Sequence, residues 1–131
     1  MKILRELAAT PLEEYQADPR NYGSGERFLQ LAIETTLSIG HHLVAARGFE
    51  QPRTYAEVFG ILGRARVLDP DFAASLEPMA RLRNRLVHVY EDVDPARIHE
   101  LLGSRLDDFD RFAQQVTSSL DAPESGEQPA G

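Results

Sequence analysis

The feature of this sequence that most restricts its fold is a run of helical periodicity over residues 26–47. Apolar or small side chains recur there every three or four residues, the spacing of one face of an α-helix. The residues are Phe28, Leu29, Leu31, Ala32, Thr35, Ile39, His42, Leu43 and Ala46. Gly48 follows and is a typical helix stop. We therefore expect a helix of about six turns that buries this set of residues.

Two short helical segments precede this run, at about residues 1–7 and 12–18. Asp18 and Pro19 have the form of an N-cap followed by proline at the first helical position. Gly23 and Gly25 weaken a helix that begins there, because glycine is a poor helix former. We therefore expect the long helix proper to begin only near Glu26.

Three further helices follow, each with its own start signal. The first covers residues 54–66 and begins with a capping box of Thr54 and Glu57. The second covers about 69–90, begins with Asp69-Pro70 and is able to contain Pro78. The third covers about 94–117 and begins with Asp94-Pro95. No strand-like alternation occurs. The predicted fold is all-α, a bundle of four or five helices over residues 1–117, followed by a disordered acidic tail over 118–131.

Charge and composition exclude several classes of protein. The 131 residues carry a net charge of −7, and residues 1–90 hold 11 acidic and 11 basic side chains. A broad basic field for coating nucleic acid is therefore absent, and any nucleic-acid contact must be local, built on Arg81, Arg83 and Arg85. The chain has no cysteine, no apolar run long enough for a membrane span and no signal-peptide segment. We expect a cytoplasmic protein with no membrane association.

Residues 81–90 form the stretch with the most distinctive chemistry. On a helix, Leu82 and Leu86 belong to an apolar seam that must face inward. Arg83, Asn84 and His88 fall on the far side of that seam, away from the core. Either this group is a site for a phosphate-bearing ligand, or it is an ordinary solvated helix face.

The motif Arg83-x4-His88-Val89-Tyr90 resembles that of HepT-like toxins, which belong to the HEPN superfamily of helical ribonucleases. The flanking segments resemble the same family: Asp18-Pro19-Arg20, Tyr22-Gly23, residues 26–34, His41-His42-Leu43, residues 54–62 and 91–95. The resemblance covers roughly residues 12–117. It implies a HEPN-type bundle that forms a homodimer.

The resemblance also implies an activity, that of a metal-independent RNA endonuclease. His88 is then the group that transfers protons near neutral pH, and Arg83 neutralises charge on the phosphate. Asn84, with Arg81 and Arg85, is expected to bind the substrate RNA. No metal and no cofactor are expected. Pairing two protomers would bring two copies of the catalytic pair across one groove.

Tyr90 has a separate implied role. In HepT-like systems the tyrosine at this place is similar to the target of a partner antitoxin, a minimal nucleotidyltransferase that attaches AMP to it. Added phosphate beside Arg83 and His88 would block the groove. A non-catalytic module that binds a nucleotide or a partner through the same face remains the alternative.

The other histidines give weaker signals. His41 and His42 point roughly 100° apart on a helix, so they cannot chelate one metal ion. We expect His42 in the core or at an interface, because it shares the periodic apolar face, and His41 at the surface. His99 lacks the second histidine of a zinc-protease helix.

Overall fold

The computed structural model of the protein describes residues 2–87 and 93–121. Within these residues the chain forms helices and no strand, which confirms the all-α prediction. The helices of the described part are α1 (Lys2–Ala9), α2 (Leu12–Ala17), α3 (Pro19–Arg47), α4 (Tyr55–Arg64), α5 (Pro70–Val87), α6 (Pro95–Arg105) and α7 (Asp107–Asp121). They number more than the expected four or five because both short amino-terminal segments form separate helices of their own and the last predicted helix is divided.

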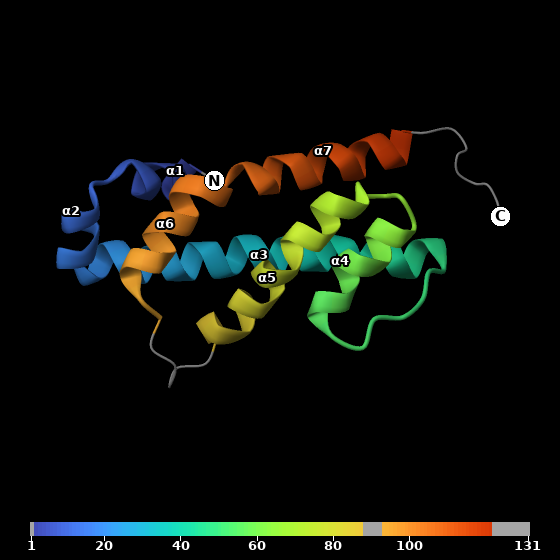
Figure 1. Cartoon of the computed structure of the whole chain (residues 1–131), viewed down its shortest axis with the longest axis horizontal. Helices are drawn as coiled ribbons and strands as arrows, with labels where there is room; N and C mark the ends of the chain where they lie inside the picture. The colour runs from blue at the N-terminus through green and yellow to red at the C-terminus, as the bar shows by residue number, and fades with distance from the viewer. Residues whose placement is uncertain (1, 88–92, 122–131) are drawn as a thin grey trace.

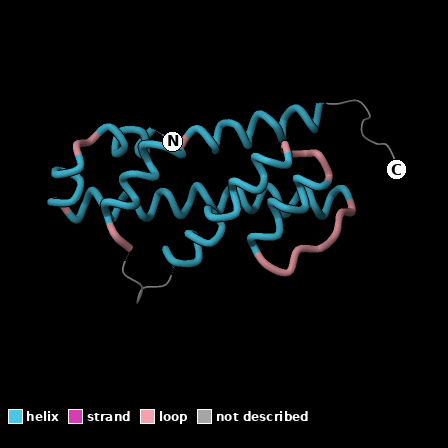
Figure 2. The backbone as a smooth tube through the Cα atoms, viewed as in Figure 1, coloured by secondary structure: helices cyan, strands magenta, loops and turns pink. Residues whose placement is uncertain are grey.

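α3 is the axis of the molecule and packs against all six other described helices. Figure 1 shows α1, α2 and α6 at its amino-terminal end, α5 across its middle, α4 toward its other end, and α7 alongside it. The tube in Figure 2 shows how short most connections between these helices are. The largest fully buried side chains come from nearly every element: Tyr15, Ile33, Leu37, Val44, Val58, Phe59, Leu62, Leu68, Leu76, Ile98 and Leu102. Burial of each such side chain contributes about 1.5–3 kcal/mol before the entropy of ordering is subtracted.

The buried side of α3 differs from the one expected from the periodicity. Its buried residues are Gly25, Leu29, Ile33, Thr36, Leu37, Gly40, Leu43 and Val44. Leu29 and Leu43 are buried as expected, but Phe28, Leu31 and Ile39 remain 38%, 37% and 41% exposed. Apolar residues occupy two sides of this helix at the same spacing, so the pattern could not tell which side the neighbouring helices cover.

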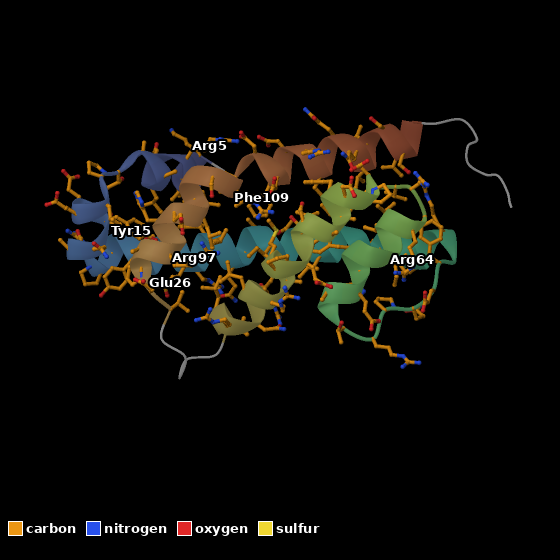
Figure 3. The ribbon with its side chains drawn as sticks, viewed as in Figure 1. Arg5, Tyr15, Glu26, Arg64, Arg97 and Phe109 are labelled. Carbon is orange, nitrogen blue, oxygen red and sulfur yellow. The ribbon has the colours of Figure 1, made fainter. Side chains whose placement is uncertain are left out.

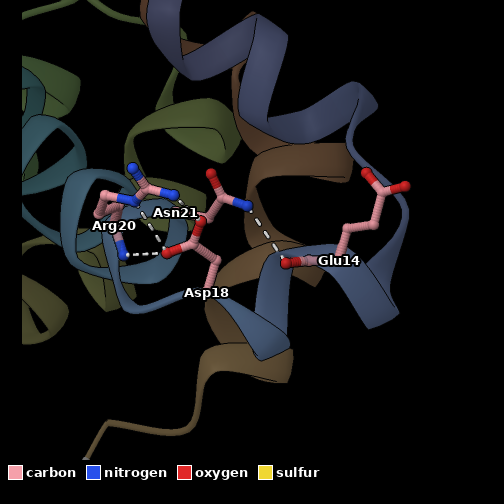
Figure 4. Close-up of polar contacts among 4 residues, drawn as sticks. All are labelled: Glu14, Asp18, Arg20 and Asn21. Carbon is pink, nitrogen blue, oxygen red and sulfur yellow. Dashed lines mark hydrogen bonds and ion pairs between the residues drawn. The ribbon is translucent and has the colours of Figure 1, made fainter.

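α3 begins at Pro19, so the expected start near Glu26 is wrong. The Asp18 carboxylate accepts the backbone N–H of Arg20 at 2.9 Å and also the Arg20 side chain (Figure 4). The Asn21 amide donates to a backbone carbonyl of α2 at 3.2 Å, which ties the two helices together. This cap and the packing around it offset the roughly 1 kcal/mol by which each glycine disfavours a helix.

The carboxy-terminal part also departs from expectation in two places. The last predicted helix is divided at Leu106, whose side chain is buried. α6 packs on α1, α2 and α3, whereas α7 packs on α3 and α6. α7 then continues to Asp121, past the expected end of the domain at residue 117. Arg47 donates to the backbone carbonyl of Ser119 at 3.1 Å and so holds its last turns against α3. Residues 122–131 of the expected tail lie outside the described residues.

Candidate active site

Arg83 lies on the inner side of α5, at the edge of the core. Leu76, Met79 and Ala80 are buried residues of this helix, and Arg83 follows them by seven, four and three residues. Helical spacing therefore directs it to the same side. Its side chain is 20% exposed and reaches α3. Leu82 and Leu86 of the predicted seam pack against the core as expected, but Arg83 also lies at the edge of the core and does not stand away from the bundle.

The Arg83 guanidinium is held by neighbours from two helices. Its Nε donates to Glu34 Oε2 of α3 at 3.1 Å, and its Nη1 donates to Asn84 Oδ1 at 3.2 Å. Gln30 Nε2 donates to the same oxygen of Glu34 at 3.2 Å. Hydrogen bonds of this charge-assisted kind fix the plane of an arginine fork. The network orients the guanidinium at the junction of α3 and α5.

A hollow of about 470 Å³ opens beside this network. It is lined by Glu34, Leu37, Ser38 and His41 of α3 and by Arg83 of α5. Small-molecule sites in proteins usually measure about 300–1,000 Å³. The hollow therefore combines a guanidinium, a carboxylate, a hydroxyl and an imidazole in a space large enough for part of a nucleotide.

His41 does not lie at the surface as expected, and His42 is not in the core, the first of the two places expected for it. His41 is half-buried and lines the hollow, whereas His42 is exposed. The expectation failed because it rested on the wrong buried side of α3. His41 follows Glu34 by seven residues and the buried Leu37 by four, so all three share one side of the helix. Sequence reasoning missed Glu34 as well, since its partner Arg83 lies 49 residues away.

Arg81 and Arg85 do not join Arg83. They line a different groove of about 520 Å³, which α5 forms with α3, α6 and α7. Arg97 of α6 and Phe109 of α7, both labelled in Figure 3, also line it. Residues two apart on a helix point roughly 200° apart, which explains why the arginines separate.

The remaining predicted site residues are only partly covered by the described structure. Asn84 is exposed and contacts Arg83 directly. His88 and Tyr90 lie outside the described residues, which on this helix end at Val87. The structure therefore assembles Arg83 and Asn84 with two residues of α3 that were not predicted to take part.

Two further features bear on what the protein can bind. Within residues 2–87 and 93–121, no three histidine or acidic side chains gather closely enough to hold a metal ion. None of the helices in the described part is long and apolar enough to cross a membrane. The polar groups of the hollow are those that bind anions and transfer protons.

Comparison with known proteins adds an independent line of evidence. Residues 1–116 match the family described as Ribonuclease HepT-like. The chain is 29% identical over 117 residues to the tRNA nuclease HepT of Aphanizomenon flos-aquae, covering 89% of this chain and 80% of that protein. It is 22% identical over 108 residues to the mRNA nuclease HepT of Shewanella oneidensis, covering 72% of this chain and 81% of that protein. The chain belongs to the ribonuclease HepT-like family.

Proposed function

We propose that this chain is a metal-independent RNA endonuclease and the toxin of a toxin–antitoxin pair. Relatives named as a tRNA nuclease and an mRNA nuclease share RNA as their substrate, which supports this class of reaction. The observation that carries the proposal is the Arg83 guanidinium, fixed by Glu34 and Asn84 at the edge of an open hollow. Arg83 stands five residues before His88, in the motif of this family.

Arg83 binds the scissile phosphate in this proposal. During cleavage, negative charge grows on the phosphate oxygens, and a preoriented guanidinium stabilises it without having to reorganise. The hydrogen bond from Arg83 Nε to Glu34 sets that orientation in advance. Because the pair is only half-buried, an incoming phosphate can approach the guanidinium from the hollow.

His88 supplies the proton transfer. Imidazole exchanges protons near neutral pH and can remove the proton of a ribose 2′-OH or donate one to the departing 5′-oxygen. The attack of the 2′-oxygen forms a new bond to phosphorus while the bond to the 5′-oxygen breaks. The products are a 2′,3′-cyclic phosphate and a 5′-hydroxyl end, with no metal ion required by the chemistry.

The other cations of α5 bind more distant parts of the RNA. Asn84 contacts the phosphate beside Arg83, and Arg81 and Arg85 bind phosphates along the second groove. Arg81 is engaged by Glu77 at 3.1 Å in an exposed pair, which contributes little to stability and can open for a phosphate. This arrangement gives local binding without a broad basic field.

A homodimer is part of the proposal. Phe28, Leu31 and Ile39 form an exposed apolar stripe on α3, at intervals of three and eight residues. An apolar stripe of this kind is typical of a helix that meets a partner. A two-fold contact along it would place the hollows of both protomers near one groove, since Glu34 lies on the adjoining side of the same helix.

Tyr90 is the proposed point of control. A minimal nucleotidyltransferase antitoxin would attach AMP to its hydroxyl, and the added phosphate would occupy Arg83 and block the groove. Incubation of the protein with the antitoxin and ATP should add AMP to wild type and not to Tyr90→Phe, as measured by mass spectrometry.

Cleavage of RNA in the presence of EDTA tests the central proposal. Wild type should cut RNA and leave cyclic-phosphate ends, and His88→Ala should abolish cleavage while keeping the helical circular dichroism spectrum. Cleavage by His88→Ala at the wild-type rate would remove the catalytic assignment. RNA binding by wild type without any cleavage would instead support the non-catalytic module.

A further inference from the structure

We propose that the second groove, the one lined by Arg81 and Arg85, binds one whole nucleotide, with the base on an apolar floor and the phosphate on arginines. The inference rests on the proposed function, in which an RNA strand supplies that nucleotide. It goes beyond the phosphate contacts already given to these two arginines by adding a surface for the base and two arginines of α6. A free nucleotide has the same chemistry as one within RNA, and the experiment separates the two sources.

Two helices form the walls of the groove and carry its arginines. α5 contributes Arg81 and Arg85, which are about one turn apart. α6 contributes Arg97 and Arg105, which are about 12 Å apart along its axis. Arg105 Nη2 donates to the backbone carbonyl of Ser75 at 2.8 Å, so the end of α6 lies beside the first half of α5 (Figure 1). The two walls therefore run in opposite directions, and Arg85 and Arg97 belong to the same end of the groove.

The floor of the groove is apolar. Leu29, Ile33 and Met79 line it and are buried. Leu101 of α6 and Phe109 of α7 line it and are half-buried. The volume of about 520 Å³ is within the range of small-molecule sites, which are mostly apolar with a few polar groups. A planar base suits such a floor, and aromatic side chains such as Phe109 are surfaces on which bases stack.

The charges of the groove favour an anion over a neutral apolar ligand. Among the described residues that line it, four are arginines and Asp94 is the acidic one. The Asp94 carboxylate is engaged as the cap of α6, where it accepts the backbone N–H of Ala96 at 3.0 Å. Arg97 pairs with Glu100 at 2.7 Å in an exposed contact that a phosphate can replace, and Arg85 pairs with no carboxylate in the described part of the chain. A phosphate therefore matches this end of the groove.

The opposite end of the groove is more rigid. Arg105 Nε donates to Asp108 Oδ2 at 2.5 Å, and its Nη2 is held by the α5 backbone, so the plane of its guanidinium is fixed. Phe109 follows it by four residues and lines the same groove. We therefore assign the base to the side of the groove that carries Arg105 and Phe109, and the phosphate to Arg85 and Arg97.

The first measurement is of RNA binding without cleavage. The probe is a short fluorescent RNA with 2′-O-methyl riboses, which leaves no 2′-OH to attack phosphorus. The variant Arg85→Ala/Arg97→Ala removes the phosphate end, and Arg53→Ala/Arg64→Ala removes two exposed arginines outside the groove as a control of equal net charge. The groove variant should bind at least about 10-fold more weakly, and its slope of log K against log salt concentration should fall by about 0.7 per arginine. The control should keep the wild-type slope.

The second measurement separates the base from the phosphate, and RNA from a free nucleotide. ADP and pyrophosphate are titrated into the protein by calorimetry. ADP should bind wild type at least about 10-fold more tightly than pyrophosphate, because its base adds stacking on the apolar floor. Phe109→Leu should reduce this ratio, which a general loss of folded protein would not change. Tighter binding of the RNA probe than of ADP assigns the groove to RNA, and the reverse assigns it to a free nucleotide.

The outcomes distinguish this inference from the proposed function. If the groove variant binds the probe and ADP as the control does, the inference is wrong, and cleavage of ordinary RNA by wild type keeps the proposed function. Equal affinities for ADP and pyrophosphate would also overturn the inference, since the groove would then hold phosphate alone. If wild type binds ADP through the groove but cuts no RNA, the proposed function is wrong and the nucleotide site stands.

Discussion

Two half-buried histidines, His99 and His41, mark regions of the molecule that use the same side chain in different ways. The His99 ring lies 5.1 Å from the ring of Tyr15, and its Nε2 is 2.6 Å from the carbonyl oxygen of Thr10. Tyr15 belongs to α2 and His99 to α6, and Gly25 of α3 lies close against the Tyr15 ring. The His41 ring instead lines an open hollow with Ser38 and Arg83. We call these regions the Tyr15 cluster and the Arg83 hollow.

The two regions differ in whether their polar groups are charged and accessible to a ligand. Tyr15 is fully buried, and its hydroxyl has no hydrogen-bond partner among the described residues. Burial and the nearby Glu26 carboxylate raise the pKa of Tyr15 to about 12, and burial raises the pKa of Glu26 (both labelled in Figure 3). The Tyr15 cluster thus suppresses charge and serves packing. The Arg83 hollow keeps its charged groups paired and open to a ligand.

The largest expected effect is on activity in the Arg83 hollow. Replacement of Arg83 by alanine should lower kcat by about 10²–10³-fold, because it removes the donor that stabilises charge on the phosphate. The unfolding free energy should fall by only about 1 kcal/mol or less, since the pair with Glu34 is partly exposed. Cleavage kinetics and urea unfolding measure the two effects.

Arg64→Ala is the control for Arg83→Ala, because Arg64 pairs with Glu50 on an exposed surface of α4. It should keep the wild-type rate. Equal losses of activity in both arginine variants would show that net charge, and not the position of Arg83, governs cleavage.

The next effect is on stability in the Tyr15 cluster. A Cβ added at Gly25 would lie 2.3 Å from Tyr15 Oη, and the buried ring has no room to withdraw. Gly25→Ala should therefore lower the unfolding free energy by about 1–3 kcal/mol. Thermal or urea unfolding measures the change, and the cleavage rate of the folded fraction should stay as in wild type.

Gly23→Ala is the matched control within the same helix. A Cβ added at Gly23 would have no neighbouring heavy atom within 4 Å. The better helix propensity of alanine should therefore stabilise the protein by up to about 1 kcal/mol. A stabilising Gly25→Ala would mean that α2 and α3 can separate without loss, contrary to the close packing described above.

A smaller effect is expected at Glu34, which positions Arg83 and does not contact the RNA in the proposed reaction. Glu34→Gln keeps an oxygen acceptor for Arg83 Nε but loses the charge, so kcat should fall roughly 10-fold, equivalent to about 1.4 kcal/mol. Glu34→Ala loses both the oxygen acceptor and the charge, so its kcat should fall further. Glu50→Gln, an exposed carboxylate, is the control. Equal rates for Glu34→Ala and Glu34→Gln would argue that the hydrogen bond to Arg83 does not orient it.

The smallest effect concerns the Tyr15 hydroxyl. Since this group has no partner in the described structure, Tyr15→Phe should change the unfolding free energy at neutral pH by less than about 1 kcal/mol. The folded protein holds the Tyr15 proton more tightly than the unfolded chain does. The resulting stability is complete below about pH 10 and is lost as the pH rises to about 12. Wild type should therefore lose stability more steeply than Tyr15→Phe between pH 10 and 12, and identical pH profiles would contradict this.

Local signals in the sequence identified three helix caps, those of Asp18, Asp69 and Asp94. The expected capping box of Thr54 and Glu57 does not form, because Thr54 makes no side-chain capping hydrogen bond and the Glu57 carboxylate accepts the backbone N–H of Arg53. Asp18 and Asp94 each accept a backbone N–H two residues on, at 2.9 and 3.0 Å, as the Asp-Pro pattern predicts. Asp69 accepts the backbone N–H of Phe72 at 3.1 Å, and Pro78 lies inside α5 without ending it. A cap is made by residues two or three apart in the chain, so it can be read without the rest of the fold.

The sequence by itself determined the all-α class, the aspartate caps and the motif that contains Arg83, because each depends on residues close together in the chain. Only the tertiary structure decided which side of α3 is buried, and with it the place of His41 beside Arg83. The reason is physical: α3 carries apolar side chains on two sides, and the side that becomes core is set by what α4, α5 and α6 bring against it. The Glu34–Arg83 pair, formed across 49 residues, depends on the same packing.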